Sequence, residues 1–330
     1  MTALVTGATG FTGGHLARYL VARGCRVLAL VRPQTSGRPQ AVSLERAGIP
    51  VVVGDLTDAG AVARACRGVD VVYHIAATYR EAGQPDSTYA AINVGGTRHV
   101  LDGARAAGVR RVVHCSTGGV HGHVEHPPAN EDAPFAPGDV YQRTKLEGEV
   151  VAREFGRAGD PEVVVFRPIG IYGPGDLRFA KMFRGIARRR FPLLGSGRVF
   201  YHLTYIDDLV EGIRLCGEVP AAAGRTYILA GPTYTTLSEL LGLVAAEFGV
   251  APPRWRWPVW PFWTAGALCE AICVPLRIEP PLYRRRVDFY TKSRAFDTTR
   301  ARRELGFAPR VDLKEGIRRT AEWYRRERLV

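Results

Sequence analysis

Short apolar runs alternate with amphipathic helical patterns along the first 230 residues of the chain. The apolar runs predict buried strands at residues 3–6, 26–31, 50–53, 69–75, 111–114, 162–167 and 226–230. Apolar residues three and four positions apart predict helices at 15–23, 89–107, 141–157, 236–248 and 313–328. Because strands that alternate with helices are typical of a doubly wound parallel sheet, we expect an α/β fold.

A glycine-rich turn follows the first apolar run and leads directly into a helical pattern. Glycine at positions 7, 10 and 13 would turn the chain, let the backbone approach a pyrophosphate and let the helix pack close to the strand. The spacing is Gly-x-x-Gly-x-x-Gly rather than Gly-x-Gly-x-x-Gly, and such turns also join strands to helices without binding a ligand. We predict that the turn binds a dinucleotide through Gly7, Thr9, Gly10, Phe11, Thr12 and Gly13.

The residues that follow the next strands bear on the identity of the dinucleotide. Arg32 ends the second strand, where an acidic residue would bind the ribose 2′-hydroxyl of NAD and an arginine suits the 2′-phosphate of NADP. NADP is therefore favoured over NAD, although Arg32 can also simply stack on the adenine. Asp55 and Leu56 are predicted to lie near the adenine, or Asp55 to cap a helix, and Ala76 and Ala77 to line the cofactor.

A second chemical motif opens the helix at 141–157. Tyr141 and Lys145 are four residues apart, so both side chains lie on one helix face, and Thr117 follows the preceding strand. A nearby ammonium group lowers the pKa of a phenol, which lets tyrosine transfer a proton close to neutral pH. We predict that Tyr141 transfers a proton and that Thr117 holds the substrate oxygen; without such chemistry, Tyr141 is a half-buried aromatic residue and Lys145 a surface charge.

Several segments together resemble the extended short-chain dehydrogenase/reductases. They are the glycine-rich turn and residues 54–56, 74–77, 93–97, 116–117, 141–145, 167–174, 204–209 and 297–305. The resemblance implies an NAD(P)-binding Rossmann domain at 1–170 plus 200–232 and a substrate lobe at 171–199 plus 233–330. It also implies a homodimer, a Thr117/Tyr141/Lys145 triad with Asn93 as a fourth member, and cofactor contacts from Ser116, Tyr141, Lys145, Pro168 and Ile169.

The residues after Thr117 narrow the expected activity. Related 4,6-dehydratases and decarboxylases carry acidic residues at the positions of Gly118 and Gly119. His121-Gly122 and the Tyr-Gln-Arg-Thr-Lys core resemble the 3β-hydroxysteroid dehydrogenase and dihydroflavonol reductase branch. We therefore expect a dehydrogenase or reductase acting on a hydrophobic secondary alcohol or ketone. A nucleotide-sugar 4-epimerase with bound NAD and a non-catalytic NADP-binding regulator are the alternatives.

Composition and charge restrict the partners. The net charge of +13 is concentrated in residues 277–330, where 16 basic residues are interrupted by 8 acidic ones without the aromatic spacing of a nucleic-acid groove. The six cysteines form no Cys-x-x-Cys pair, which indicates neither a metal site nor a disulfide framework. The chain begins directly with a strand pattern rather than a signal peptide, so we expect a cytoplasmic enzyme with a small-molecule substrate and no nucleic acid.

Four of the five tryptophans lie in residues 255–263, before an apolar stretch that continues to residue 276. This segment has three possible roles: a roof over an apolar ligand, a core of the smaller lobe, or a peripheral membrane contact beside the arginines at 284–286. Pro258, Pro261 and Pro275 interrupt the segment well short of the length of a membrane-spanning helix.

Overall fold

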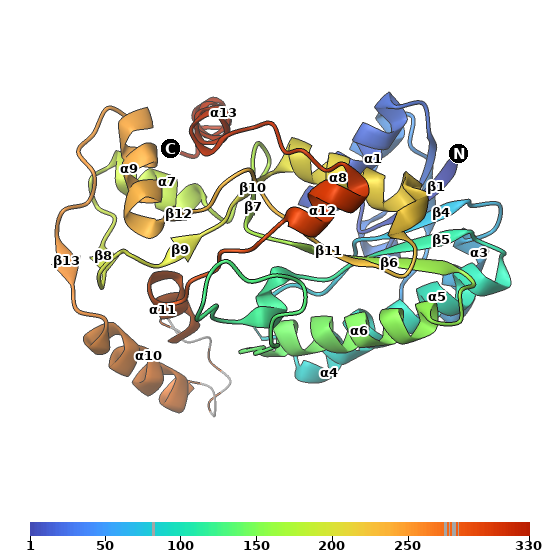
Figure 1. The fold of residues 1–330 in the computed structure, drawn as a ribbon, viewed down its shortest axis with the longest axis horizontal. Helices are drawn as coiled ribbons and strands as arrows, with labels where there is room; N and C mark the ends of the chain where they lie inside the picture. Colours follow the sequence, from blue (N-terminus) through green and yellow to red (C-terminus); the bar gives the residue numbers. More distant parts are fainter. Residues whose placement is uncertain (81–82, 274–275, 277, 279–281, 283) are drawn as a thin grey trace.

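The computed structural model describes residues 1–330 except 81–82, 274–275, 277, 279–281 and 283 (Figure 1). Residues 274–275 belong to the apolar stretch considered above, so this part of it lies outside the described residues, as does the side chain of Arg285.

A seven-stranded sheet with only parallel neighbours forms the larger part of the molecule. The strand order is β11-β6-β5-β4-β1-β2-β3. The strands are β1 (Thr2–Thr6), β2 (Arg26–Val31), β3 (Val51–Val53), β4 (Val71–His74), β5 (Arg111–Cys115), β6 (Glu162–Pro168) and β11 (Thr226–Leu229). The order reverses between β1 and β4, and ligands of such sheets bind at the carboxyl ends of the strands at this point. The predicted α/β fold is confirmed.

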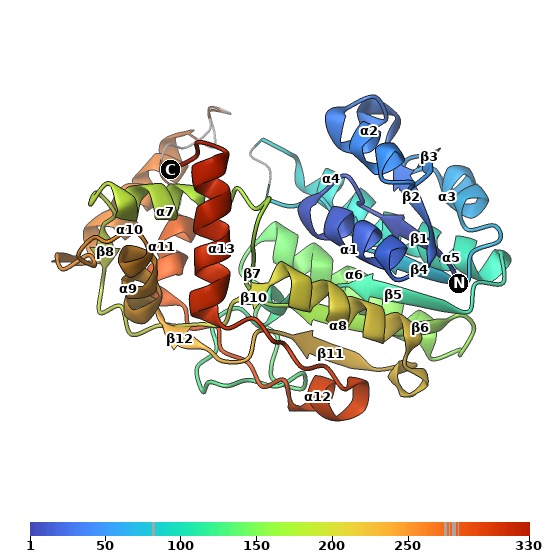
Figure 2. The same ribbon diagram turned by 90° about the horizontal axis from the view of Figure 1, so that it is seen from above.

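Helices cover both faces of this sheet (Figure 2). One apolar cluster joins the sheet to α1 (Phe11–Ala22), α2 (Pro39–Arg46) and α8 (Ile206–Glu218). A second cluster joins the other face to α3 (Ala59–Ala65), α5 (Gly96–Ala106) and α6 (Val140–Gly156). Strands buried on both faces have apolar residues at successive positions, which is why the apolar runs were visible in the sequence.

The smaller lobe contains short strands and several helices. Its elements are β7 (Ile171–Tyr172), α7 (Ala180–Ala187), β8 (Leu193–Leu194), β9 (Phe200–Tyr201), β10 (Thr204–Tyr205), β12 (Thr235–Thr236), α9 (Leu237–Glu247), β13 (Arg256–Trp257), α10 (Trp260–Cys273), α11 (Arg284–Thr291) and α13 (Leu313–Arg326). By contrast, α12 (Thr299–Leu305) packs against β11 and α8 of the larger part.

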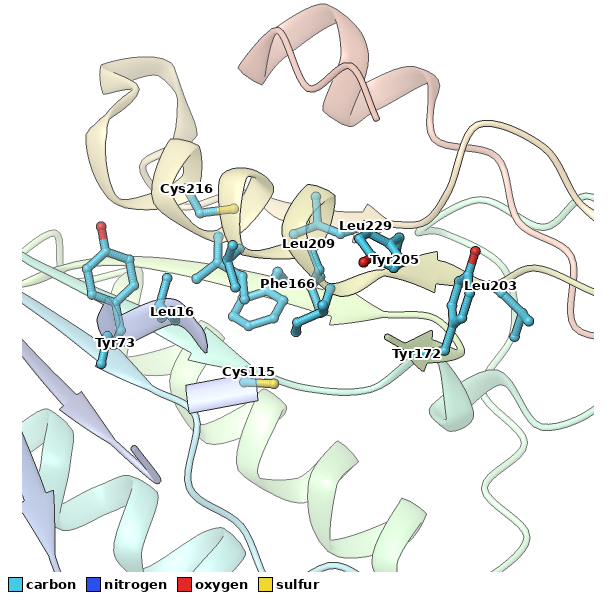
Figure 3. Close-up of a cluster of buried hydrophobic side chains, with 14 of the residues drawn as sticks. Leu16, Tyr73, Cys115, Phe166, Tyr172, Leu203, Tyr205, Leu209, Cys216 and Leu229 are labelled. Atoms are coloured by element: carbon cyan, nitrogen blue, oxygen red, sulfur yellow. The ribbon is translucent and has the colours of Figure 1, made fainter. Parts of the chain in front are cut away.

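One apolar core runs from the sheet into the lobe. Figure 3 shows it extending beneath α8 from Tyr73 on β4 to Tyr172 and Leu203 at the junction. The same cluster includes Leu240 of α9 and Tyr324 of α13, whose hydroxyl donates to the Asp176 carbonyl oxygen at 2.6 Å. Because the two parts share a core, the lobe is held firmly at the carboxyl ends of the strands.

Two of the predicted helices differ from their predicted bounds by more than two residues. Helix α1 begins at Phe11, four residues before the predicted start, because the glycine-rich turn passes directly into it. The segment predicted as one helix at 89–107 consists of α4 (Asp86–Ala90), a π-helical turn η2 (Ala91–Gly95) and α5. Short 3₁₀ turns occur at η1 (Pro33–Thr35), η3 (Gly118–His121) and η4 (Pro220–Ala222).

Candidate active site

A cavity of about 720 Å³ lies at the carboxyl ends of the strands, between the sheet and the lobe. Most of the residues predicted to form the site line it. They are Gly7, Thr9, Gly10, Phe11, Thr12, Gly13, Arg32, Asp55, Leu56, Ala76, Ala77, Ser116, Thr117, Tyr141, Pro168 and Ile169. Lys145 and Asn93 are buried behind the lining.

The glycine-rich turn leaves no room for side chains. Gly7 has a φ of +72°, and a Cβ atom there would lie 2.8 Å from the backbone of Ala76. A Cβ atom on Gly13 would lie 2.3 Å from the carbonyl oxygen of Gly7. Gly10 precedes α1 and supplies no side-chain cap to the first amides of this helix. The bare backbone and the open helix N-terminus fit the pyrophosphate of a dinucleotide.

The neighbouring strand ends provide the surroundings expected for an adenosine group. Arg32 is exposed at the end of β2, and its guanidinium has no hydrogen-bond or ion-pair partner among the described residues. Asp55 accepts hydrogen bonds from the backbone amide and hydroxyl of Thr57, at 2.9 and 2.8 Å. Asp58, rather than Asp55, caps α3. The predicted alternative of Asp55 as a helix cap is therefore wrong.

A neutral histidine fixes the ends of β1 and β4 beside the glycine-rich turn. The Thr97 hydroxyl donates to the Asn93 carbonyl oxygen at 2.8 Å, so His74 Nε2 donates to Thr97 Oγ1 at 3.1 Å. His74 Nδ1 then accepts from the Thr6 hydroxyl at 2.9 Å, and Thr6 Oγ1 accepts from the Ala76 amide at 3.1 Å. Burial, together with the charge of Lys145, lowers the pKa of His74 to about 3, so it stays uncharged at neutral pH.

Thr117 and Tyr141 meet at the cavity wall. Thr117 begins the η3 turn after β5, and its Oγ1 accepts from the Gly119 amide at 3.1 Å. Tyr141 lies in the first turn of α6, which Asp139 caps by accepting from the Gln142 amide at 2.8 Å. Both residues line the cavity, and the Thr117 hydroxyl lies near enough to lower the pKa of Tyr141, so both side chains can contact one substrate oxygen. Burial raises the pKa of Tyr141 and favours the neutral phenol.

Lys145 lies one turn further along α6 and is 1% exposed. Its ammonium group donates to the carbonyl oxygen of Cys115, which lines the cavity. Burial lowers the pKa of Lys145. The positive charge of Lys145 therefore lies behind the cavity wall, beside the end of β5, where it contributes to the electrostatic potential of the site.

Asn93 connects the loop after β4 with α6. Its Oδ1 accepts from the Thr78 amide at 2.8 Å, and its Nδ2 donates to the Thr144 hydroxyl at 3.0 Å. The residue lies in the π-helical turn η2 and is 1% exposed. Asn93 therefore has the geometry of a positioning residue, because Thr78 lines the cavity and the Thr144 hydroxyl contacts the backbone of Tyr141.

Arg80 contacts Tyr141, although the sequence analysis did not single it out. Its guanidinium carbon lies 5.5 Å from the centre of the Tyr141 ring, and its Nε donates to Asp139 at 2.8 Å. The ring of Tyr79 meets that of Tyr141 edge-on, with ring centres 4.9 Å apart. Burial raises the pKa of Tyr141, whereas the positive charge of Arg80 opposes this effect. The sequence gives no signal for this contact because Arg80 belongs to a loop.

Ser116 belongs to a buried ionic network below the cavity. Its hydroxyl donates to Glu149 at 2.6 Å, and Glu149 pairs with Arg167 through both carboxylate oxygens. Arg167 also donates to the Glu131 carbonyl oxygen at 2.7 Å and contacts His121 Nε2 at 3.0 Å. This network joins β5, α6 and β6 to the loop that follows Thr117.

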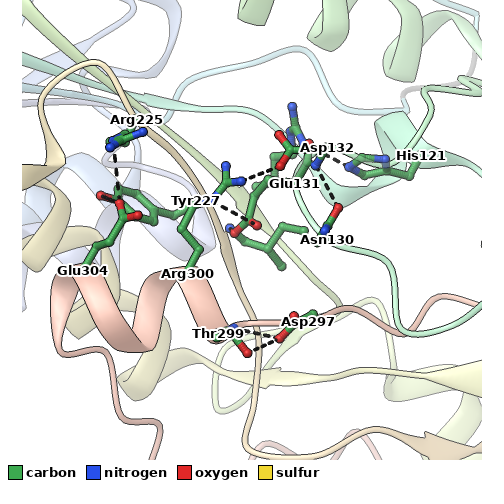
Figure 4. A network of polar contacts seen from close by, with 12 residues as sticks. His121, Asn130, Glu131, Asp132, Arg225, Tyr227, Asp297, Thr299, Arg300 and Glu304 are labelled. Carbon is green, nitrogen blue, oxygen red and sulfur yellow. Dashed lines mark hydrogen bonds and ion pairs between the residues drawn. The ribbon is translucent and has the colours of Figure 1, made fainter.

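The same loop is held against α12 from its outer side (Figure 4). Arg300 forms ion pairs with Glu131 at 3.6 Å and with Asp132 at 2.5 Å. A carboxylate oxygen of Glu131 also accepts from the Ile228 amide at 2.9 Å. Contacts on both sides therefore fix the loop that carries Thr117.

The lobe end of the cavity is largely apolar. The apolar residues that line it are Ile171, Phe179, Tyr201, Leu203, Phe289 and Phe296. Arg178, His202 and Arg294 are the polar lobe residues of the lining, and Arg178 pairs with Asp176 at 2.7 Å. Of the described lining residues, only Asp55 has a carboxylate, and none is a tryptophan.

Gly118 and Gly119 explain why no acid follows Thr117. A Cβ atom on Gly118 would lie 2.0 Å from Cδ1 of Ile169, so no side chain fits there. A Cβ atom on Gly119 would lie 3.0 Å from Nε2 of Gln142, which already occupies that space. Ile169 and Gln142 thus take up the space in which the related dehydratases and decarboxylases are expected to place their acidic side chains.

This combination of fold and site defines a dinucleotide-binding α/β protein with a second lobe over the strand ends. Residues 3–230 match the NAD dependent epimerase/dehydratase family, and the chain belongs to this family. The predicted membership in the extended short-chain dehydrogenase/reductases is thereby confirmed.

Relatives with different activities match almost the whole chain. It is 34% identical to 2-alkyl-3-oxoalkanoate reductase of Stenotrophomonas maltophilia, over 97% of this chain and 98% of the relative. It is 31% identical to UDP-glucose 4-epimerase of Mycolicibacterium smegmatis, over 98% and 99%. It is 30% identical to sterol demethylase protein B of Methylococcus capsulatus, over 100% of both chains. The steroid-related branch expected from the sequence is therefore among its relatives.

A solved structure shows the same architecture. A short-chain dehydrogenase/reductase superfamily protein from Agrobacterium tumefaciens, crystallised with bound NAD, is 26% identical and superimposes with a TM-score of 0.77. The match covers 100% of this chain and 98% of that protein. This chain thus has the Rossmann-type fold of a family of NAD-dependent enzymes.

Proposed function

We propose that this protein is an NAD(P)-dependent reductase that interconverts a hydrophobic ketone and the corresponding secondary alcohol. The observation that supports this most strongly is that Thr117 and Tyr141 line one cavity together with the glycine-rich turn and the apolar residues of the lobe. The absence of a carboxylate near Thr117 among the described lining residues disfavours elimination and decarboxylation, which need an additional acid or base.

Each residue of the predicted triad has a role in the proposed reaction. Thr117 and Tyr141 hold the substrate oxygen, and the Tyr141 hydroxyl donates its proton to that oxygen during reduction. Lys145 holds the Cys115 carbonyl and keeps a positive charge behind the wall. The dinucleotide, when bound, supplies or accepts the hydride.

The role of Tyr141 in the proposed reaction follows from the protonation state of its phenol. A raised pKa keeps the phenol protonated at neutral pH, and a protonated phenol is a proton donor. Reduction of a ketone needs a donor at the oxygen, whereas oxidation of an alcohol needs a base. We therefore infer that Tyr141 is the proton donor when the ketone is reduced at neutral pH.

The substrate class rests on the lobe end of the cavity. Phe179, Phe289 and Phe296 suit an alkyl chain or a ring system, as in a steroid-, terpenoid- or flavonoid-like molecule. Arg294 has no acidic partner among the described residues and can bind a carboxylate. The relative from Stenotrophomonas is named for a 2-alkyl-3-oxoalkanoate, and such a molecule combines a ketone, apolar chains and a carboxylate.

NADP is the proposed cofactor, with NAD as the alternative. The exposed guanidinium of Arg32 lies at the end of β2, where a 2′-phosphate would be bound. The relatives and the NAD-bound neighbour support a nicotinamide cofactor of either kind.

A 4-epimerase remains the second candidate because a UDP-glucose 4-epimerase covers nearly the whole chain at 31% identity. Such an enzyme retains its NAD and shows no net oxidation. The two candidates therefore differ in whether reduced cofactor is consumed.

One turnover experiment separates the candidates. The purified protein is incubated with NADPH or NADH and either a 2-alkyl-3-oxoalkanoate or a 3-ketosteroid, and in parallel with UDP-glucose without added cofactor. We expect ketone-dependent loss of absorbance at 340 nm, faster with NADPH. Conversion of UDP-glucose to its 4-epimer, with copurified NAD found by mass spectrometry, would favour the epimerase instead. Binding of NADPH without any turnover would point to a regulator.

A further inference from the structure

The described part of residues 255–278 presents a large apolar surface to solvent, which we call the tryptophan face. Eight of its side chains are exposed by 48–84%: Trp255, Trp257, Trp260, Trp263, Leu268, Ile272, Leu276 and Ile278. They make up eight of the fifteen large apolar side chains that are exposed among the described residues. Scattered exposed apolar residues are ordinary, but eight of them within one short stretch of the chain are typical of a surface that binds a partner.

Helix α10, which carries half of this face, has little contact with the protein core. Gly266 is its only buried residue. With 14 residues the helix extends about 21 Å, which is shorter than the roughly 30 Å of a bilayer core. No helix in the described parts of the chain is long and apolar enough to cross a membrane. The face is thus suited to lying on a bilayer rather than to spanning it.

The charges around the tryptophan face are mostly positive. The charged side chains that the structure describes within residues 249–287 are four arginines and Glu270, and Glu270 pairs with Arg284 at 2.6 Å. Arg254 and Arg256 alternate with Trp255 and Trp257, and the guanidinium of Arg284 lies 5.7 Å from the Trp263 ring. Tryptophan and arginine together favour the interface between lipid headgroups and acyl chains, and arginine adds attraction to anionic lipids.

We propose that the tryptophan face binds the surface of an anionic phospholipid bilayer. A second copy of this chain is a poorer partner, because two such faces would bring an excess of arginines together, and Glu270 is already paired with Arg284. A lipid surface instead supplies both an apolar layer for the tryptophans and negative charge for the arginines.

The position of α10 connects this surface with the candidate active site. α10 lies at the lower edge of the lobe in Figure 1 and packs against α11. Phe289 of α11 lines the cavity. Docking through α10 thus brings the apolar end of the cavity close to the bilayer, from which a hydrophobic substrate can enter.

Vesicle binding tests the proposal without reference to catalysis. The full chain, in a Trp323→Phe background, is mixed with phosphatidylcholine vesicles with or without phosphatidylglycerol. Flotation measures binding, and tryptophan emission reports on the face because its four tryptophans are then the only ones. We expect a blue shift and about tenfold or tighter binding with phosphatidylglycerol.

Two variants and one control assign the binding to this face. Trp255→Ser/Trp260→Ser and Arg254→Glu/Arg256→Glu should each weaken vesicle binding about tenfold or more. Leu177→Ser, at a side chain exposed by 62% elsewhere, should not change it. Circular dichroism and the melting temperature verify that each variant is folded.

The proposal would be contradicted if the Trp255→Ser/Trp260→Ser variant floated with the vesicles as well as the parent does. It would also be contradicted if neither protein bound the vesicles. A parent dimer that the tryptophan variant converts to a monomer in light scattering, without vesicle binding, would assign the face to self-association. Vesicle flotation does not depend on catalysis, so it can be measured even if the protein has no reductase activity. Failure of the proposed function and failure of membrane binding are therefore distinguishable.

Discussion

At the residue scale, the structure adds Arg80 to the residues that surround the phenol of Tyr141. It lies over the rings of both Tyr79 and Tyr141 and is held by Asp139, the residue that caps α6. Its charge acts against the effect of burial on the pKa of Tyr141. Arg80 therefore makes proton removal from Tyr141 easier than burial alone would allow.

Replacement of Arg80 should shift the pH dependence of alcohol oxidation. In that direction Tyr141 acts as a base, so kcat/KM rises with pH through the pKa of Tyr141. In Arg80→Gln the opposing charge is lost, the pKa rises further, and the rising limb moves to higher pH. The pH profile of kcat/KM measures this shift.

Arg143→Gln is the matched control. Arg143 lies on the same helix as Tyr141, is half-exposed, and pairs with Asp86 at 3.5 Å. We expect its profile to coincide with that of the parent. A rising limb that stays in place in Arg80→Gln, or moves to lower pH, would contradict the assigned effect of Arg80.

Sequence patterns predicted the residues of the site unevenly. Tyr141 and Lys145 were visible because a four-residue spacing on a helix is a local signal. The contacts of Arg80, and the pair of Glu149 with Arg167, join residues that are distant in the chain. No local pattern encodes such contacts, so they could be identified only once the fold was known.

At the scale of elements, the glycine-rich turn should bind the dinucleotide only with its bare backbone. A Cβ atom on Gly13 would lie 2.3 Å from the Gly7 carbonyl oxygen, so Gly13→Ala must displace the turn from α1. We expect the dissociation constant for NADPH to rise about tenfold or more, equal to about 1.4 kcal/mol. Isothermal titration calorimetry measures it.

Gly242→Ala is the control for this substitution. Gly242 lies in α9, and a Cβ atom there meets no atom within 4 Å. Alanine should leave NADPH affinity unchanged and stabilise the helix by about 1 kcal/mol. Unchanged NADPH affinity in Gly13→Ala would refute the assigned role of the turn.

The strands were predicted more accurately than the helices. Strands buried on both faces give continuous apolar runs, and β2 matches its predicted bounds of 26–31. The π-helical turn η2 within the predicted helix at 89–107 was missed, because it depends on Asn93 bonding to Thr78 and Thr144. Such tertiary contacts override the helical period that the sequence shows.

At the scale of the whole molecule, the fold class and the position of the cavity followed from the order of strands and helices. The exposure of the tryptophan face did not follow from the sequence. The sequence pattern allowed a roof over a ligand, a core of the smaller lobe or a peripheral membrane contact. The structure exposes its four tryptophans by 48–84%, which disagrees with the core interpretation. The homodimer implied by the family resemblance, and the division into two domains, stay predictions.

Transfer of deuteride by the whole enzyme tests most directly whether Tyr141 donates the proton in a hydride transfer to a ketone. NADPH carrying deuterium at the transferable C4 position is mixed with the ketone, and mass spectrometry follows deuterium in the product. We predict one deuterium at the new alcohol carbon, and about 100-fold or slower transfer in Tyr141→Phe at unchanged NADPH affinity. Equal rates in Tyr141→Phe and the parent, or bound cofactor and ketone without any deuterium transfer, would contradict this function.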